Sequence, residues 1–128
     1  MKRRWLTGDL KSWMDGGRKR ATVLAGARQT GKTTLARGVA GDRLRYLSLD
    51  DPVLRTEILR LPAESLARHF PAAVLDEVRK APALLEVVKA VLDAGGQGRY
   101  LLLGSSHLLP LGERLWAVPD VLLFGERM

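Results

Sequence analysis

Residues 21–36 read ATVLAGARQTGKTTLA, and this stretch decides the fold. The apolar run Ala21–Ala25 leads into eight residues, from Gly26 to Thr33, that fit the pattern G-x-x-x-x-G-K-[ST] at every fixed position. A strand, a glycine-rich loop and a helix in this order cradle phosphate, because the N–H groups of the loop and of the helix N-terminus face one anion. The stretch therefore predicts a nucleoside triphosphate site, with ATP as the ligand. A plain glycine turn between a strand and a helix is the alternative.

Each position of this phosphate loop has an expected role. Gly26 and Gly31 permit backbone angles that a side chain forbids. Lys32 is expected on the β- and γ-phosphates, the Thr33 hydroxyl on Mg²⁺, and the Thr34 hydroxyl near the α-phosphate. The predicted nucleotide-binding residues are Gly26, Ala27, Arg28, Gln29, Thr30, Gly31, Lys32, Thr33 and Thr34.

The rest of the chain alternates short apolar runs with longer amphipathic stretches. The clearest amphipathic stretch, Ala83–Ala94, follows Pro82 and ends at Gly95, which predicts a helix. Asp51 before Pro52 predicts the start of another helix. Strands alternating with helices indicate an α/β fold: a three-layer sandwich with a mostly parallel five-stranded sheet of P-loop NTPase type, in one domain over residues 1–128. The expected strands are Ala21–Ala25, Tyr46–Leu49, Ala72–Leu75, Tyr100–Leu103 and Val121–Phe124.

Two carboxylates follow the third apolar run. Ala72–Leu75 leads directly into Asp76 and Glu77, and ligands of parallel sheets bind outside the carboxyl ends of strands. We expect Asp76 to join the Mg²⁺ shell and Glu77 to act as the general base that orients water. A solvated strand end, where acidic residues are common, is the alternative.

Small hydroxyls follow the fourth apolar run. Gly104, Ser105 and Ser106 come after Tyr100–Leu103. Either serine could hydrogen-bond the γ-phosphate or the attacking water, and the alternative is that the segment is simply a turn.

Composition limits the function further. There are no cysteines, which excludes disulfides, thiolate metal sites and a cysteine nucleophile. No apolar run approaches the roughly 20 residues of a membrane-spanning helix, so we expect a cytoplasmic protein without membrane contact. The net charge of +7 fits a solvated basic surface with a nucleotide site better than it indicates nucleic acid, although nucleic acid stays an open partner.

Four ordered motifs carry a family resemblance. GARQTGKTTLA at 26–36, YLSLDDP at 46–52, LDEVRKAP at 75–82 and LLGSS at 102–106 resemble prokaryotic AAA-type P-loop ATP-binding proteins of the AAA+ superfamily. The resemblance implies an additional-strand core in which Lys32, Thr33, Asp76 and Glu77 hold phosphate, magnesium and water, and in which Ser105 or Ser106 senses the γ-phosphate. It also implies that this chain holds the ATPase core only, without the helical lid and C-terminal domain.

Two functional hypotheses follow. The first is a Mg²⁺-dependent ATPase module that releases ADP and phosphate, with Lys32, Glu77, Ser105 and Ser106 as the catalytic set. The alternative is a nucleotide-binding or interaction module with little or no turnover, with nucleic acid as a partner of its basic surface. A homo-oligomer is an open partner in either case, since Arg114 could act as an arginine finger in a head-to-tail assembly.

Overall fold

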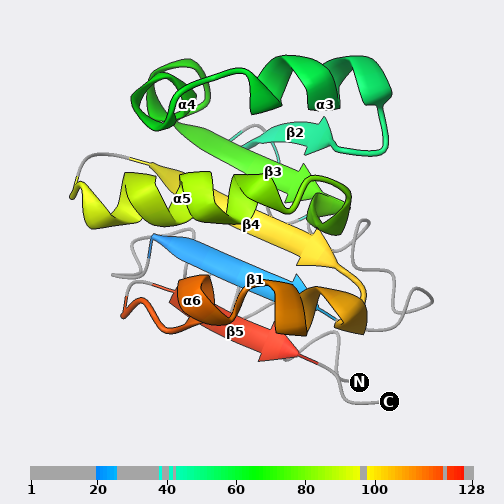
Figure 1. Ribbon diagram of the computed structural model, residues 1–128, viewed down its shortest axis with the longest axis vertical. Coiled ribbons are helices and arrows are strands. Elements are labelled where there is room, and N and C mark those ends of the chain that lie inside the picture. Colours follow the sequence, from blue (N-terminus) through cyan, green and yellow to red (C-terminus); the bar gives the residue numbers. More distant parts are fainter. Residues whose placement is uncertain are drawn as a thin grey trace.

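A computed structural model describes residues 20–25, 38, 41, 43–95, 98–119 and 121–125. In these residues, five strands alternate with α-helices and short 3₁₀ helices (Figure 1). In chain order, the elements are β1 (Ala21–Ala25), β2 (Arg45–Ser48), α3 (Pro52–Leu59), α4 (Ala63–His69), β3 (Ala72–Asp76), η2 (Val78–Lys80), α5 (Ala83–Asp93), β4 (Arg99–Gly104), η3 (Ser106–Leu111), α6 (Glu113–Trp116) and β5 (Val121–Gly125).

The strands form one sheet in the order β2-β3-β4-β1-β5, and all of its pairings are parallel. All five arrows therefore point the same way in Figure 1. Strand β4 lies between β1 and β3, so the strand that leads into the phosphate loop is one strand away from the strand that ends in Asp76. The family resemblance implies an additional strand between these two strands, and β4 occupies that position.

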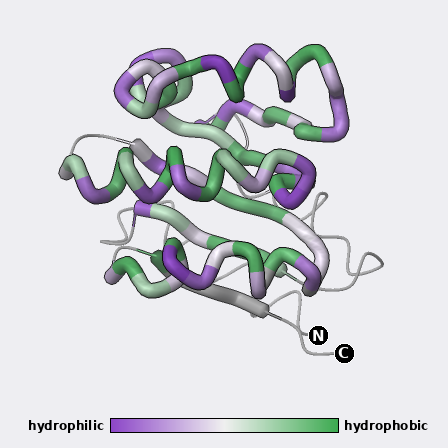
Figure 2. The backbone as a smooth tube through the Cα atoms, in the orientation of Figure 1, coloured by the Kyte–Doolittle hydropathy of each residue, from purple (hydrophilic) through white to green (hydrophobic). Residues whose placement is uncertain are grey.

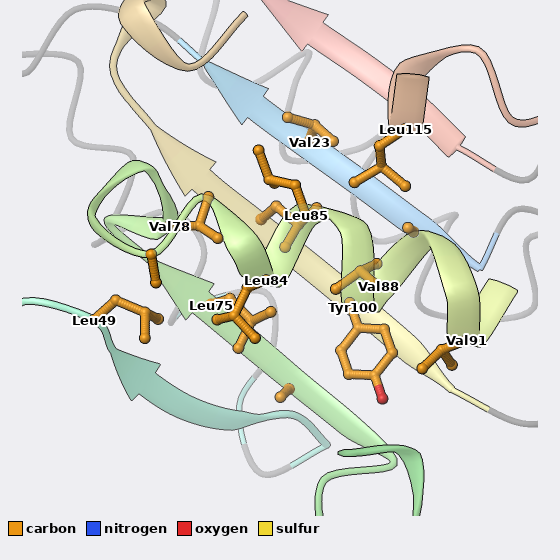
Figure 3. Packing of buried hydrophobic residues seen from close by; sticks show 14 of the residues in the cluster. Val23, Leu49, Leu75, Val78, Leu84, Leu85, Val88, Val91, Tyr100 and Leu115 are labelled. Atoms are coloured by element: carbon orange, nitrogen blue, oxygen red, sulfur yellow. The ribbon is translucent and has the colours of Figure 1, made fainter. Parts of the chain in front are cut away.

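Helix α5 covers the middle of the sheet. Its buried residues include Leu84, Leu85 and Val88, each at most 1% exposed, and Figure 3 shows them above Leu75 and Tyr100. Figure 2 shows green and purple alternating along α5, whereas β4 is mostly green. The helix thus buries one apolar stripe and the sheet buries whole strands, as expected for a parallel sheet under helices.

Alternation along the strands divides the buried residues into two sets. The cluster that contains α5 also contains Val23, Leu75 and Leu102. Leu24 and Leu101 are also buried, but each lies between two cluster residues of its strand, so their side chains point to the opposite face. The sheet is therefore apolar on both faces.

Tyr100 is the largest fully buried side chain, and it lies under α5 toward the amino end of β4 (Figure 3). Its hydroxyl is buried and has no hydrogen-bond partner among the residues that the structure describes. Burial raises the pKa of Tyr100 to about 12, against a smaller lowering by the Arg20 cation. The space beside the ring is tight, because a Cβ on Gly98 would lie 3.0 Å from the ring atom Cε2.

The α/β class and the parallel sheet are confirmed. Strand β1 has the predicted bounds, and helix α5 ends one residue before the predicted Ala94. The start of α3 is confirmed in detail, because Asp51 is its N-cap and accepts hydrogen bonds from the N–H groups of Val53 and Leu54. The third layer of the predicted sandwich lies outside the described residues and stays a prediction.

Candidate functional site at the carboxyl edge of the sheet

The carboxyl ends of four neighbouring strands meet at one edge of the sheet. Leu24 of β1 pairs with Leu103 of β4, and Leu75 of β3 pairs with Leu102. Asp76, one residue further on and the last residue of β3, is thus level with Leu24, one residue before the end of β1. Glu77 follows Asp76 directly, in the turn after β3.

The spacing suits a triphosphate site. Two neighbouring gaps of about 4.8 Å put β1 and β3 roughly 10 Å apart. A Mg²⁺ ion keeps several waters at about 2.1 Å and also takes phosphate oxygens. This separation between β1 and β3 is of the size that a hydrated Mg²⁺ ion and its phosphate ligands need.

The Asp76 carboxylate is built into the sheet. Asp76 is the last residue of β3 and is 8% exposed. Such low exposure is unusual for an aspartate unless it is paired. The Tyr46 hydroxyl of β2 donates a hydrogen bond to Asp76 Oδ2. Tyr46 lies opposite Val74 in the register, so both partners belong to the face of the sheet that turns away from α5.

Glu77 has a strained backbone. Its φ of 55° and ψ of 43° lie in the left-handed region, and it is the only non-glycine residue with positive φ in the described part of the chain. A side chain in this region costs roughly 1–2 kcal/mol. The Glu77 carbonyl accepts the Lys80 N–H, which closes the turn that holds this conformation. Such strain is found preferentially at functional sites.

Ser105 lies at the end of β4, next to Gly104. Its hydroxyl caps η3 by accepting the His107 N–H at 3.3 Å, and it lies 3.3 Å from His107 Nδ1. This contact gives Ser105 a local structural role, while its predicted phosphate-sensing role stays a prediction. Ser106 begins η3.

The other acidic pair near this edge has structural partners. Asp51 caps α3, and Asp50 forms an ion pair with Lys80 of η2. The ion pair joins the loop after β2 to the turn after β3. The predicted place of Asp51 at the start of a helix is therefore confirmed.

The phosphate loop itself, residues 26–34, lies outside the described residues, so its nine predicted nucleotide contacts, Lys32 and Thr33 among them, stay predictions. Strand β1, which directly precedes the loop in the sequence, is an interior strand of the sheet and is fully buried. The structure therefore describes the strand from which the loop begins.

The donor atoms near Asp76 fit a magnesium ion. In the part of the chain that the structure describes, no three His, Asp or Glu residues gather into a metal-binding cluster. Magnesium does not need one, because it is usually held by one or two carboxylates together with phosphate oxygens and water. The buried Asp76 carboxylate at the strand end suits the protein's part of such a set.

A central parallel strand that leads into a G-x-x-x-x-G-K-[ST] loop, with an acidic strand end one strand away, defines a P-loop nucleotide-binding module. A family model described as an AAA domain matches residues 18–115. The chain therefore belongs to the AAA domain family, which confirms the resemblance inferred from the sequence motifs. A comparison with curated proteins found no match.

Two predictions from the sequence concern the surface: that the protein does not contact a membrane, and that a homo-oligomer is an open partner. Within the described part of the chain, each helix is too short or too polar to cross a membrane. The Arg114 side chain is 76% exposed, and its Nη1 lies 3.7 Å from Glu86 Oε1 of α5. Its role as an arginine finger in a homo-oligomer stays a prediction.

Proposed function

We propose that this AAA domain binds ATP with Mg²⁺ and hydrolyses it to ADP and phosphate. The observation that carries the proposal is the register that puts Asp76 level with Leu24, near the end of β1, with Glu77 as the next residue. It supports a site in which Asp76 belongs to the metal shell and Glu77 is a second carboxylate, near the strand that the phosphate-loop motif follows in the sequence. A site that only held nucleotide would not need the second carboxylate.

The roles follow from chemistry. The loop amides and Lys32 hold the β- and γ-phosphates, and Thr33 and Asp76 would hold Mg²⁺, which neutralises charge on the phosphate oxygens when it is bound. Glu77 accepts a proton from the water that attacks the γ-phosphorus, and the bond to the leaving ADP oxygen breaks. A serine at the end of β4, Ser105 or Ser106, would hydrogen-bond the γ-phosphate or this water.

The left-handed turn at Glu77 supports its role. The residue after a strand normally continues along the strand direction, but the turn redirects the chain into η2. A glycine would adopt this conformation without strain. A glutamate at such a position is best explained by a need for its carboxylate at the edge of the sheet.

The test measures ATP binding and phosphate release side by side. Lys32→Ala is expected to abolish binding, because it removes the cation that contacts the phosphates. Glu77→Gln is expected to retain binding and to lower phosphate release by roughly 10²–10⁴-fold, the usual contribution of a general base. The matched controls are Glu57→Gln on the exposed surface of α3 and Lys89→Ala on α5, which should leave both quantities unchanged.

Each alternative gives a different result. Equal release from the wild type and Glu77→Gln would contradict the role of Glu77. Tight ATP binding by the wild type, lost in Lys32→Ala, with no phosphate release from either, would favour the nucleotide-binding module without turnover.

A further inference from the structure

We propose that Tyr46 is a positioning residue that orients the Asp76 carboxylate for the metal ion bound with the nucleotide. The inference rests on the proposed function, because it assigns Tyr46 a role in the same site. Its basis is the hydrogen bond from the Tyr46 hydroxyl to Asp76 Oδ2.

Sheet geometry explains why tyrosine suits this position. Tyr46 pairs with Val74, and Asp76 is two residues further along β3 on the same face. Such a diagonal pair has its backbones about 7–8 Å apart, a distance that an aromatic side chain spans and a short one does not. Ser48 pairs directly with Asp76, but the hydroxyl that donates to Asp76 Oδ2 is that of Tyr46.

The carboxylate needs such a partner. The terminal torsion of an aspartate is broad, so its backbone and χ1 alone do not fix the plane of its two oxygens. The tyrosine hydroxyl donates its hydrogen bond to one defined oxygen, Oδ2. Because Asp76 is 8% exposed, bulk water competes weakly with this bond. Tyr46 therefore selects one rotation of the carboxylate before metal and nucleotide arrive.

Pre-orientation has a measurable consequence. Loss of a group that orients a metal ligand typically costs roughly 10–100-fold in metal affinity or activity. The hydroxyl lies on β2, at the opposite side of β3 from β1, so its loss should leave the loop contacts to phosphate intact. Loss of the Tyr46 hydroxyl should therefore raise the Mg²⁺ concentration that the protein requires, and it should leave the affinity for nucleotide without metal unchanged.

The experiment compares Tyr46→Phe with Tyr100→Phe. The chain has two tyrosines, and Tyr100 lies at the amino end of the sheet, so the control removes the same atom away from the site. ATP affinity is measured by calorimetry in EDTA and across a Mg²⁺ titration, and Mn²⁺ binding in the presence of ATP is followed by electron paramagnetic resonance. Thermal unfolding midpoints show whether both variants are folded at the assay temperature.

The expected result is that Tyr46→Phe raises the half-saturating Mg²⁺ concentration by roughly 10–100-fold and weakens Mn²⁺ binding similarly. ATP affinity in EDTA should be unchanged, and Tyr100→Phe should match the wild type in ATP affinity, Mg²⁺ requirement and Mn²⁺ binding. An unchanged metal requirement in folded Tyr46→Phe would overturn the inference and leave the proposed function standing. A wild type whose ATP affinity ignores Mg²⁺ would overturn both.

A double-mutant cycle separates positioning from a general structural effect. If Tyr46 acts through Asp76, then Tyr46→Phe should change the metal requirement of Asp76→Asn by less than twofold, because the oriented ligand is already gone. The cycle also serves if Tyr46→Phe lowers stability, since it compares variants that share that defect. Additive effects of the two substitutions would overturn the positioning role.

Discussion

Replacing Tyr100 with phenylalanine should remove a pH-dependent part of the stability. Burial raises the pKa of Tyr100 in the folded protein from 10.0 to about 12. Below pH 10 the hydroxyl is protonated in both states. Between about pH 10 and 12 the unfolded chain loses this proton and the folded protein keeps it, so the free energy of unfolding decreases as the pH rises.

The size of the effect follows from the shift. Each pKa unit corresponds to about 1.4 kcal/mol, so raising the pH through this window should cost the wild type about 3 kcal/mol that Tyr100→Phe does not lose. At pH 7 the variant should be at least as stable as the wild type, because the buried hydroxyl has no partner among the described residues and burying an unsatisfied polar group costs about 1–3 kcal/mol.

The assay is urea unfolding of both proteins at a series of pH values from 8 to 12. All other ionisable groups are the same in the two proteins, so their contributions cancel in the difference between the two free energies of unfolding. A difference that stays constant across the series would refute the reasoning, because it would mean that Tyr100 titrates equally in the folded and unfolded states.

Two further substitutions test the elements around the site. Asp51→Ala removes the acceptor for the Val53 and Leu54 N–H groups and should cost about 0.5–2 kcal/mol in urea unfolding, whereas Asp51→Asn should retain most of the stability; equal losses would argue against capping. Gly104→Ala places a Cβ 2.9 Å from the buried Leu108 Cδ2 and should cost about 1–3 kcal/mol. Its control is Gly38→Ala, where the added Cβ meets nothing within 4 Å, and a loss as large in the control would contradict the packing argument.

The strands were predictable because their signal is local. A strand buried on both faces must be apolar along its length, and the run Ala21–Ala25 shows this directly. The prediction for β2 was displaced by one residue, since it included Leu49 and the strand is Arg45–Ser48. Leu49 is fully buried, and its N–H donates to the Asp76 carbonyl. Burial alone therefore does not mark the end of a strand.

The sequence predicted helix α5 but not helix α4, because a helix is also recognised by local features of the sequence. Helix α5 has a clear apolar stripe, whereas α4 is short and only Leu66 is buried in it. Its N-cap is Pro62, which makes no side-chain capping bond. Without a stripe or a capping side chain, little in the sequence marks this helix.

The sequence allowed Asp76 and Glu77 to be chosen as candidate site residues, but it did not predict the contact between Tyr46 and Asp76. Asp76 and Glu77 follow from the end of an apolar run, which is a local feature. The bond from Tyr46 to Asp76 depends on the register between β2 and β3, and register is a property of the assembled sheet. The alternation of side chains along each strand indicates which residues share a face of the sheet, but it does not say which strands are neighbours.

The sheet order also affects how the chain folds during synthesis. Strand β1 is made before both of its neighbours in the sheet, β4 and β5, which come later in the sequence. At about 5–20 residues per second, the ribosome needs roughly 4–20 s to make those neighbours after β1. During that time both hydrogen-bonding edges of an apolar strand lack their partners, which is a liability for aggregation. The strand that leads into the phosphate loop is therefore exposed to aggregation until β4 and β5 have been made.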